Sequence, residues 1–109
     1  MKYREGLAQS LLDAMGNDPK VVILGESVSD PKGIFGTTLP SAQSYPERVI
    51  EIPVSENMIT GACLGLALEG WKPVLVHSRC EFMMVAMENM INTAAKWKVL
   101  YRPRHAGGL

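Results

Sequence analysis

The sequence lacks the features that mark several classes of protein. No apolar run reaches the ~18 residues that a membrane-spanning helix needs, and the N-terminal stretch MKYREGLAQS contains no hydrophobic signal core. Lysine and arginine together number 11, and so do aspartate and glutamate, so no basic excess points to a nucleic acid or to an anionic membrane surface. We therefore expect a cytoplasmic protein with neither nucleic acid nor membrane among its partners.

Cysteine pairs, nucleotide-binding loops and metal motifs are missing as well. The two cysteines, Cys63 and Cys80, fit neither a CxxC motif nor a zinc-ligand spacing, and their apolar neighbours favour buried free thiols. Neither GxGxxG nor GxxxxGK[ST] occurs, and Gly33 and Gly36 match a phosphate-binding loop only weakly. His77 has no acidic or thiol partner in a triad-like context, so we interpret it as structural. No metal site is predicted.

What the chain does contain is the composition of one globular domain. With 109 residues, of which 47% are hydrophobic and 20% charged, it is long enough for one core and too short for two. Apolar residues at helical spacing predict a helix over residues 3–15. Gly16 is expected to end that helix in the left-handed conformation, and Pro19 blocks its continuation.

Strand patterns follow. Consecutive apolar residues in KVVILGE (20–26) predict a strand buried on both faces, as in a parallel sheet. RVIEIP (48–53) predicts a short strand, and KPVLVHS (72–78) predicts another buried one. Between the first two, residues 27–46 are rich in Pro, Gly, Ser and Thr and predict a long loop at the carboxyl end of the first strand, where ligands bind in open α/β sheets.

Two more helices complete the pattern. SENMITGACLGLALEG (55–70) predicts a helix with Ser55 as its N-cap and Gly70 as its stop. Residues 81–97 predict a last helix whose methionines fill a core or an interface, and the tail 98–109 has no periodicity. The alternation of helices and strands predicts a three-layer α/β fold, with a mostly parallel sheet flanked by helices on both faces.

Glu56 is the one charged residue at the start of a long apolar helix. An acid in the first turn is ordinary, because it interacts with the helix dipole by ~0.3–1 kcal/mol. Apolar flanks, however, also give a carboxylate the shifted proton affinity that acid–base chemistry uses. In the same helix, Gly61 and Gly65 lie four apart, which indicates either tight packing or a dimer seam or ligand approach. Spacing alone leaves these alternatives open.

Taken together, several blocks resemble one family. The sequence is similar to the beta subunit of the decarboxylating component of 2-oxoacid dehydrogenase complexes, of pyruvate, branched-chain or acetoin type. More broadly, it resembles the pyrimidine-binding domain of transketolase-like thiamine diphosphate enzymes. The likeness covers residues 1 to about 98 and is carried, in order, by LGES, GIFGTT, YPERVIEIPVSENMITGACLGLALEGWKPVLV and EFMMVAMENMINTAAKW.

The resemblance implies a cofactor and residues that bind it. It gives Glu56 the catalytic role of hydrogen-bonding N1′ of the aminopyrimidine of thiamine diphosphate. It makes Glu26, in LGES, the acidic residue near the cofactor, and Phe82 the aromatic residue that packs on the pyrimidine. The His-Ser-Arg segment at 77–79 departs from the apolar or amide residues common in the family, which is compatible with a different oxo acid or a sugar-like donor.

The resemblance also implies a partner. Family members continue into further strands and a C-terminal domain, so we expect residues 1–109 to form a single truncated pyrimidine-binding domain with an irregular tail at 98–109. The diphosphate and Mg²⁺ are expected on an alpha-type partner subunit, which would leave this chain inactive alone, and we expect a homodimer or higher oligomer. The alternative is a non-catalytic, truncated relative that acts as a binding or assembly module.

Overall fold

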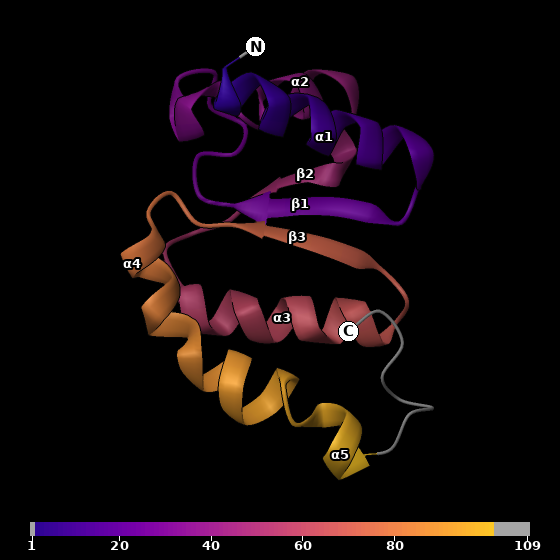
Figure 1. Cartoon of the computed structure of the whole chain (residues 1–109), viewed down its shortest axis with the longest axis vertical. Coiled ribbons are helices and arrows are strands. Elements are labelled where there is room, and N and C mark those ends of the chain that lie inside the picture. Colours follow the sequence, from indigo (N-terminus) through magenta and orange to yellow (C-terminus); the bar gives the residue numbers. More distant parts are fainter. Residues whose placement is uncertain (1, 102–109) are drawn as a thin grey trace.

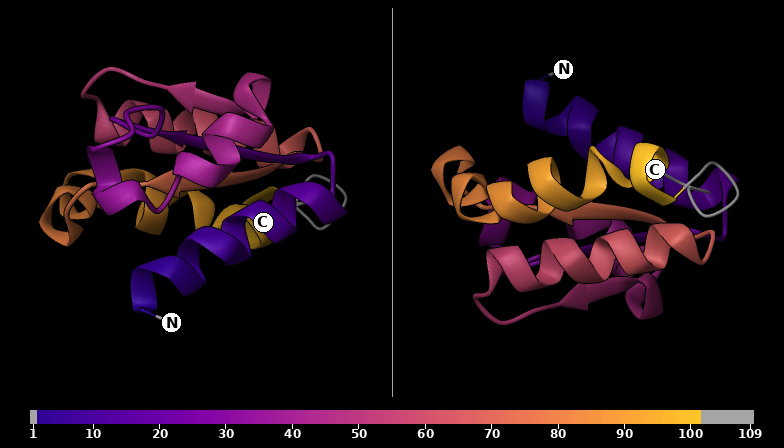
Figure 2. Two further views of the ribbon diagram at one scale, coloured as in Figure 1. Left: turned by 90° about the horizontal axis from the view of Figure 1, so that it is seen from above. Right: turned by 90° about the horizontal axis from the view of Figure 1, so that it is seen from below.

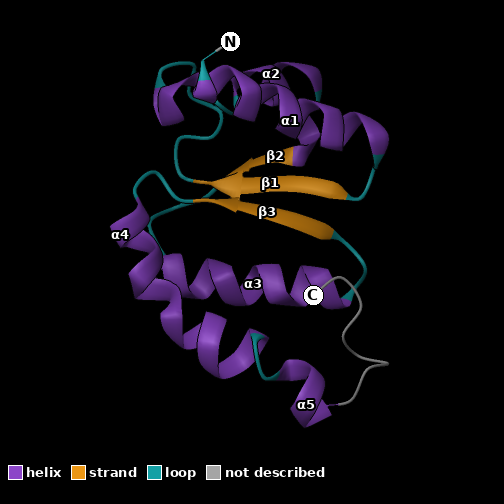
Figure 3. Cartoon of the chain, viewed as in Figure 1, coloured by secondary structure: helices purple, strands orange, loops and turns teal. Residues whose placement is uncertain are grey.

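Parallel strands run through the middle of the molecule, with helices on either side (Figures 1 and 3). The structure is a computed structural model and describes residues 2–101. Its strands, in the spatial order β2-β1-β3, are β1 (Val21–Gly25), β2 (Val49–Glu51) and β3 (Lys72–Val76). Its α-helices are α1 (Tyr3–Asn17), α2 (Leu39–Ser44), α3 (Glu56–Leu68), α4 (Cys80–Met83) and α5 (Trp97–Tyr101). The remaining helical elements are the 3-10 turns η1 (Gly33–Gly36), η2 (Pro46–Arg48) and η3 (Met84–Ala86), and the π-helix η4 (Glu88–Ala94).

Helices cover both faces of this sheet. α1 and α2 lie on one face, and α3 with the helical elements that follow β3 lies on the other (Figure 1). β1 pairs in parallel with both β2 and β3. The chain must therefore cross a face of the sheet each time before it enters the next strand in the same direction. The predicted three-layer α/β fold with a parallel sheet is confirmed.

β1 is the centre of the core. Val21 and Ile23 belong to the apolar cluster beneath α1, and Val22 and Leu24 belong to the cluster against α3. Successive side chains of a strand point to opposite faces, so one strand supplies both clusters. All of β1 is buried, and Ile23 is 0% exposed. The prediction of a strand buried on both faces is confirmed.

Arg48 ties the amino end of the sheet to the end of α1. Its guanidinium donates hydrogen bonds of 3.0, 3.1 and 3.2 Å to the backbone carbonyls of Met15, Asp18 and Val21. Lys72, at the start of β3, adds an ion pair of 2.6 Å with the Asp18 carboxylate. The hydrogen bond from Lys72, followed by that from the Lys20 N–H, lowers the pKa of Asp18. These contacts hold the edge of the sheet where the strands begin.

The end of α1 differs from its prediction. Gly16 does not adopt the left-handed conformation; α1 continues to Asn17, and the Asp18 N–H donates to the Ala14 carbonyl. A Cβ at Gly16 would come 3.3 Å from the Tyr45 hydroxyl. The glycine therefore makes room for a side chain that lies far away in the sequence, and a local pattern cannot reveal that.

The segment 27–46, predicted as one long loop, contains the turn η1 and the short helix α2. Thr38 is fully buried at the start of α2, and its hydroxyl donates a hydrogen bond of 2.7 Å to the Val28 carbonyl. Val28 in turn belongs to the cluster beneath α1. The loop prediction was wrong for 39–44, because Ser41 is fully buried and Ala42 packs against the core. Residues 33–36 form only a short turn in which no residue is buried.

The last predicted helix is divided. Residues 81–97 fall into α4, η3, η4 and the start of α5, rather than one α-helix. The Asn89 N–H donates to the Asn57 Oδ1 at 3.3 Å, which takes it out of the α-helical ladder, and a π-type bond from Ala95 to Met90 closes the following turn. Of the predicted irregular tail, 98–101 is helical, and 102–109 lies outside the described residues.

Two burial predictions were wrong. β3 is exposed at Lys72 and half-buried beyond it, because it pairs on one side only among the described strands. Cys80 is an exposed free thiol at the start of α4, whereas Cys63 is buried, and burial raises the pKa of its thiol.

Gly70 does end α3, with φ +86°. Within residues 2–101, no helix is long and apolar enough to cross a membrane.

Replacing Arg48 should destabilise the fold. Arg48→Met removes three hydrogen bonds and leaves partly buried carbonyls without their donor, so we expect the free energy of unfolding to fall by about 2–3 kcal/mol. Urea denaturation followed by circular dichroism measures this. Arg4→Met, at an exposed position of α1, serves as the control and should change stability by less than ~0.5 kcal/mol. Equal effects of the two changes would contradict the role given to Arg48.

Candidate functional site

The carboxyl ends of the three strands lie along one edge of the sheet (Figure 1). Glu26 directly follows β1, and Glu51 is the last residue of β2. A short connection then leads from β2 to Glu56, the first residue of α3. β3 is followed by the segment that carries Phe82 in α4. Parallel pairing thus brings all three residues predicted for the site to the same edge, where ligands of open α/β sheets bind.

Glu56 is half-buried at the first turn of α3. Its backbone carbonyl accepts a hydrogen bond of 2.8 Å from the Thr60 hydroxyl. Ser55 stands at the expected N-cap position, but its side chain makes no cap hydrogen bond. Within residues 2–101, no hydrogen bond or ion pair engages the Glu56 carboxylate. The helix N-terminus therefore presents a carboxylate that is available to a ligand.

Glu51 holds the loop that carries Glu26, and sequence reasoning missed it. One carboxylate oxygen accepts from the Ser27 N–H; the other accepts from the Ser29 N–H at 3.1 Å and the Ser29 hydroxyl at 2.7 Å. Ser27 has φ +58°, an uncommon conformation for a residue with a side chain. The Glu51 carboxylate thus accepts hydrogen bonds from two backbone N–H groups of the tight turn after β1. An acid as the last residue of a strand, opposite a serine-rich turn, is the signal that could have found it.

These hydrogen bonds set the proton affinity of Glu51. Partial burial alone raises the pKa of this carboxyl group, but the hydroxyl and N–H of Ser29 and the N–H of Ser27 together outweigh it and lower the pKa below its ordinary value of 4.5. Glu51 is therefore ionised at neutral pH and fixes the β1 loop as a charged acceptor.

Phe82 is half-buried, and its ring lies beside Arg79, which forms an ion pair with Glu81. The Arg79 guanidinium lies 5.6 Å from the centroid of the Phe82 ring and 2.6 Å from a carboxylate oxygen of Glu81. The Phe82 N–H donates to the Arg79 carbonyl at 3.1 Å. Arg79 belongs to the polar His-Ser-Arg segment at 77–79. This segment therefore helps to fix the aromatic ring.

Asn57 and Asn89 lock the last helical segment onto the start of α3. The Asn89 amide nitrogen donates to the Asn57 carbonyl at 2.7 Å and to the Asn57 Oδ1 at 3.1 Å. A Cβ at Gly61 would come 3.3 Å from the same amide nitrogen, whereas nothing lies within 4 Å of a Cβ at Gly65. Tight packing therefore explains Gly61. It does not explain Gly65, for which a seam or ligand approach stays a prediction.

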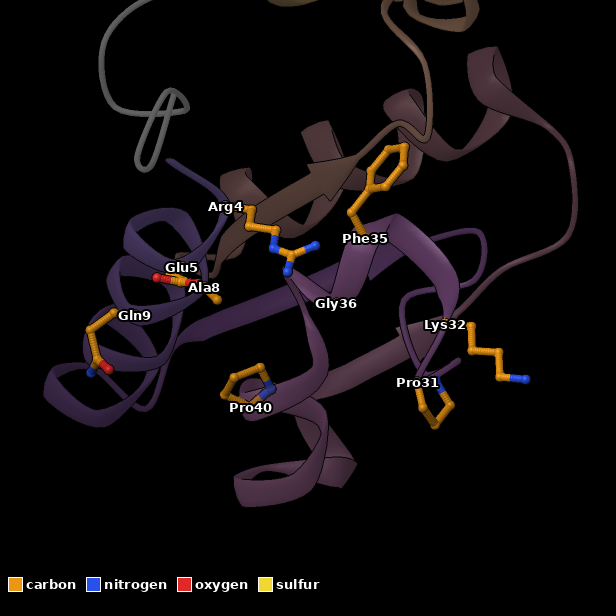
Figure 4. Close-up of a pocket in the computed structure, with 9 residues that line it drawn as sticks. All are labelled: Arg4, Glu5, Ala8, Gln9, Pro31, Lys32, Phe35, Gly36 and Pro40. Atoms are coloured by element: carbon orange, nitrogen blue, oxygen red, sulfur yellow. The ribbon is translucent and has the colours of Figure 1, made fainter. Parts of the chain in front are cut away.

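An open groove lies between α1 and the η1 segment (Figure 4). It measures about 620 Å³. Arg4 extends from α1 toward η1, whereas Lys32 points away (Figure 4). None of Glu26, Glu56 and Phe82 lines it, so size alone does not identify the site.

Comparison with known proteins identifies the family. The model of the transketolase pyrimidine-binding domain matches residues 1–102. The chain belongs to this family. It is 36% identical over 97 residues to pyruvate dehydrogenase E1 component subunit beta-2, mitochondrial, of rice, which covers 88% of this chain and 26% of that protein. The corresponding values for subunit beta-1 of Arabidopsis thaliana are 37%, 88% and 27%.

A bacterial relative shows the same pattern. The pyruvate dehydrogenase E1 component subunit beta of Rickettsia bellii is 33% identical over 94 residues, which is 85% of this chain and 29% of that protein. The chain thus spans between about a quarter and a third of the curated relatives that it matches. The family resemblance stated from the sequence blocks is confirmed, while the individual roles of Glu26, Glu56 and Phe82 stay predictions.

The stabilising contribution of Glu51 should depend on pH. Its pKa is lower in the folded chain than in the unfolded chain, so the stabilisation is present above pH 4.5 and is lost as pH falls through the folded value. Glu51→Gln should cost about 1 kcal/mol at pH 7, at the low end for charged hydrogen bonds because the residue is solvent-exposed. Urea titrations at pH 7 and pH 3.5 should show the difference shrinking at the lower pH. Glu47→Gln is the control, and a cost independent of pH would contradict the assignment.

The two glycines of α3 should respond oppositely to alanine. Gly65→Ala gains helix propensity without a clash and should stabilise the chain by about 0.5–1 kcal/mol. Gly61→Ala meets the Asn89 amide, so its gain should be cancelled or reversed. Thermal unfolding of the two variants side by side measures this. Equal stabilisation would show that the Asn57–Asn89 contact does not constrain α3.

Proposed function

We propose that this chain supplies the pyrimidine-binding half of a thiamine diphosphate site in a 2-oxoacid dehydrogenase-like enzyme. The observation that carries the proposal is Glu56: a half-buried carboxylate, without an intramolecular partner in the described residues, at the start of α3 and the carboxyl edge of the sheet. Membership of the transketolase pyrimidine-binding family supports this reading. Glu26 and Phe82 lie at the same edge and complete the proposed set.

The residues present fit an aminopyrimidine. Such a ring offers a flat aromatic face, ring nitrogens and an exocyclic amine. Phe82 provides an aromatic surface already braced by Arg79, and the carboxylates of Glu56 and Glu26 are acceptors for ring and amine protons. Glu51 holds the loop next to Glu26, and Asn57 fixes the turn next to Glu56. Side chains that touch the ring are thus supported from behind by hydrogen bonds, as a positioned site requires.

Thiamine diphosphate, when bound, supplies the electron sink for cleavage beside a 2-oxo group. In this proposal, Glu56 binds N1′ of the pyrimidine and holds a proton there, which activates the ring. The first turn of α3 keeps the carboxylate in place. A hydrogen bond to a ring nitrogen strengthens when water is excluded, so the apolar residues of α3 around Glu56 suit this work.

The diphosphate and Mg²⁺ belong, in this proposal, to an alpha-type partner subunit. The relatives are named as beta subunits of a multi-subunit component, which supports a shared site. The polar segment His77–Arg79 next to Phe82 favours an oxo acid or sugar-like donor other than pyruvate. Self-association into a homodimer or higher oligomer remains part of the proposal.

A binding or assembly module is the second candidate. Large apolar side chains are exposed along the last helical segment, at Met84, Val85 and Ile91. Exposed apolar surface marks interaction sites where it is contiguous. In a module without catalysis, Glu56 would only stabilise the helix dipole, and its replacement would leave partner binding and cofactor affinity unchanged.

Glu56→Gln separates the two candidates. Reconstituted with a candidate alpha-type subunit, thiamine diphosphate, Mg²⁺ and an artificial electron acceptor, the variant should lose at least ~100-fold in turnover, because an amide cannot share the proton. Calorimetric titration should show cofactor affinity changed by less than ~10-fold, since the amide keeps the shape. Glu69→Gln, just past the other end of α3, should behave as wild type.

The chain alone, given the same reagents, should show no turnover of any 2-oxo acid. Turnover without a partner would overturn the shared site. Full activity of the reconstituted Glu56→Gln protein would overturn the role of Glu56. Partner binding without any turnover by the reconstituted wild-type protein would favour the assembly module.

A further inference from the structure

Glu56 and Phe82 reach the candidate site from the two outer strands of the described sheet. Glu56 follows β2 and begins α3, whereas Phe82 follows β3 and lies in α4. Among the described strands, β2 and β3 each pair with β1 and not with one another. The sheet therefore fixes where the two segments leave it, but its ladder does not join the segment that carries Glu56 to the segment that carries Phe82.

Asn57 and Asn89 join these two segments. Asn57 directly follows Glu56, and Asn89 lies seven residues after Phe82 in the same helical run, a separation of about two turns. The Asn89 side-chain amide donates to the Asn57 carbonyl at 2.7 Å and to its Oδ1 at 3.1 Å. The Asn89 N–H donates to the same Oδ1 at 3.3 Å. Within residues 80–94, every hydrogen bond that reaches α3 comes from Asn89.

These hydrogen bonds add direction to a contact that is otherwise apolar. α3 and the helical segment after β3 lie side by side (Figure 2). Ala86, between Phe82 and Asn89, is fully buried in η3, which packs against α3. Apolar burial is non-directional, whereas a hydrogen bond restricts both a distance and an angle. The Asn57–Asn89 bonds therefore fix how far the helical segment can slide or turn along α3.

The chain gives up helix stability where it makes this contact. Gly61 lies inside α3, where a glycine costs about 1 kcal/mol relative to alanine, and a Cβ there would come 3.3 Å from the Asn89 amide nitrogen. Asn89 also lies in the π-helix η4, a rare form that occurs frequently at functional sites. Local rules of this kind are broken mainly where function requires it. Stability alone therefore does not explain a contact that is made at a cost in stability, next to Glu56.

We propose that Asn57 and Asn89 are a positioning pair, which fixes the Phe82 ring relative to the Glu56 carboxylate. This role rests on the proposed function, in which one ring of the cofactor contacts both Glu56 and Phe82. The pair acts through these two residues and not by contact with the cofactor. Groups of a site must be held within about 0.5 Å of their productive geometry by supporting hydrogen bonds. The positioning pair supplies such bonds between the two segments that carry the site.

Fluorine NMR tests the position of the ring without any cofactor. The sequence contains two phenylalanines, Phe35 and Phe82, so the 109-residue chain labelled with 4-fluorophenylalanine gives one resonance from each. Phe35 is 80% exposed on η1 and serves as the internal control. Asn57→Leu and Asn89→Leu remove the hydrogen bonds with little change in side-chain volume. Both should move the Phe82 resonance and leave that of Phe35 in place.

Matched variants separate the pair from a general effect on the helical segment. Asn92→Leu changes the same residue type at an exposed position of η4 and should leave both resonances unchanged. Asn57→Asp keeps both acceptor oxygens and should keep the wild-type Phe82 resonance. If the leucine variants fail to fold, as judged by circular dichroism, Gly61→Ala carries the test. It crowds the Asn89 amide without removing a hydrogen-bonding group, and it should move the Phe82 resonance alone.

Cofactor affinity tests whether the position of the ring matters for binding. The chain is reconstituted with a candidate alpha-type subunit and titrated calorimetrically with thiamine diphosphate and Mg²⁺. Asn89→Leu should weaken affinity at least ~10-fold, or about 1.4 kcal/mol, and Asn92→Leu should leave it unchanged. In a Phe82→Leu background, Asn89→Leu should cost less than ~3-fold further, because the ring that it positions is gone. A purely structural role predicts equal losses in both backgrounds.

Different results would overturn the positioning pair and the proposed function. If the reconstituted wild-type protein does not bind thiamine diphosphate, the proposed function is wrong, and the role of the pair is lost with it. If the wild-type protein binds the cofactor but the leucine variants leave the Phe82 resonance unmoved, the positioning pair alone is wrong. Equal losses of affinity for Asn89→Leu with and without the Phe82 ring would lead to the same conclusion.

Discussion

Parallel pairing of β1 with both of its neighbours is the constraint on which the rest of the structure depends. A buried central strand with parallel neighbours forces every connection across a face of the sheet, so helices must cover both faces. It also collects the three carboxyl ends at one edge. Glu26 and Glu56, which are 30 positions apart in the sequence, come to that edge because β1 and β2 end there, and Phe82 comes to it because β3 does.

The two edges of the sheet are stabilised differently. At the amino edge, Arg48 donates to three backbone carbonyls and Lys72 forms an ion pair with Asp18, so these charged side chains all have partners within the chain. At the carboxyl edge, the Glu51 carboxylate accepts hydrogen bonds from Ser29, whereas the Glu56 carboxylate has no partner among the described residues. A carboxylate held on a rigid helix and left without an internal partner is the arrangement that a ligand-binding residue requires.

Local pattern predicted the parts of the fold that local forces decide. The apolar run of β1, the start of α3 at Glu56 and the stop at Gly70 are each specified within a few residues, and all three are in the structure. The predictions failed where distant residues decide. Gly16 makes room for Tyr45, and Asn89 leaves its helical ladder for Asn57.

The candidate site divides along the same line. Glu26, Glu56 and Phe82 came from a family resemblance, and the topology places them at one edge. Glu51 was missed because its importance lies in three donors on a turn 22 to 24 residues earlier in the chain. Sequence spacing can indicate which residues contact a ligand when a motif is known, but supporting hydrogen bonds depend on how two loops meet in space.

β3 leads directly into the candidate site. Its apolar sequence predicts a buried strand, but the structure leaves it partly exposed. Val74 and Val76 are half-buried and line apolar cavities. His77 directly follows β3 and is the first residue of the segment that leads through Arg79 to Phe82. Phe82 lies only five residues after His77. The end of β3 therefore helps to set the position of the aromatic ring in the candidate site.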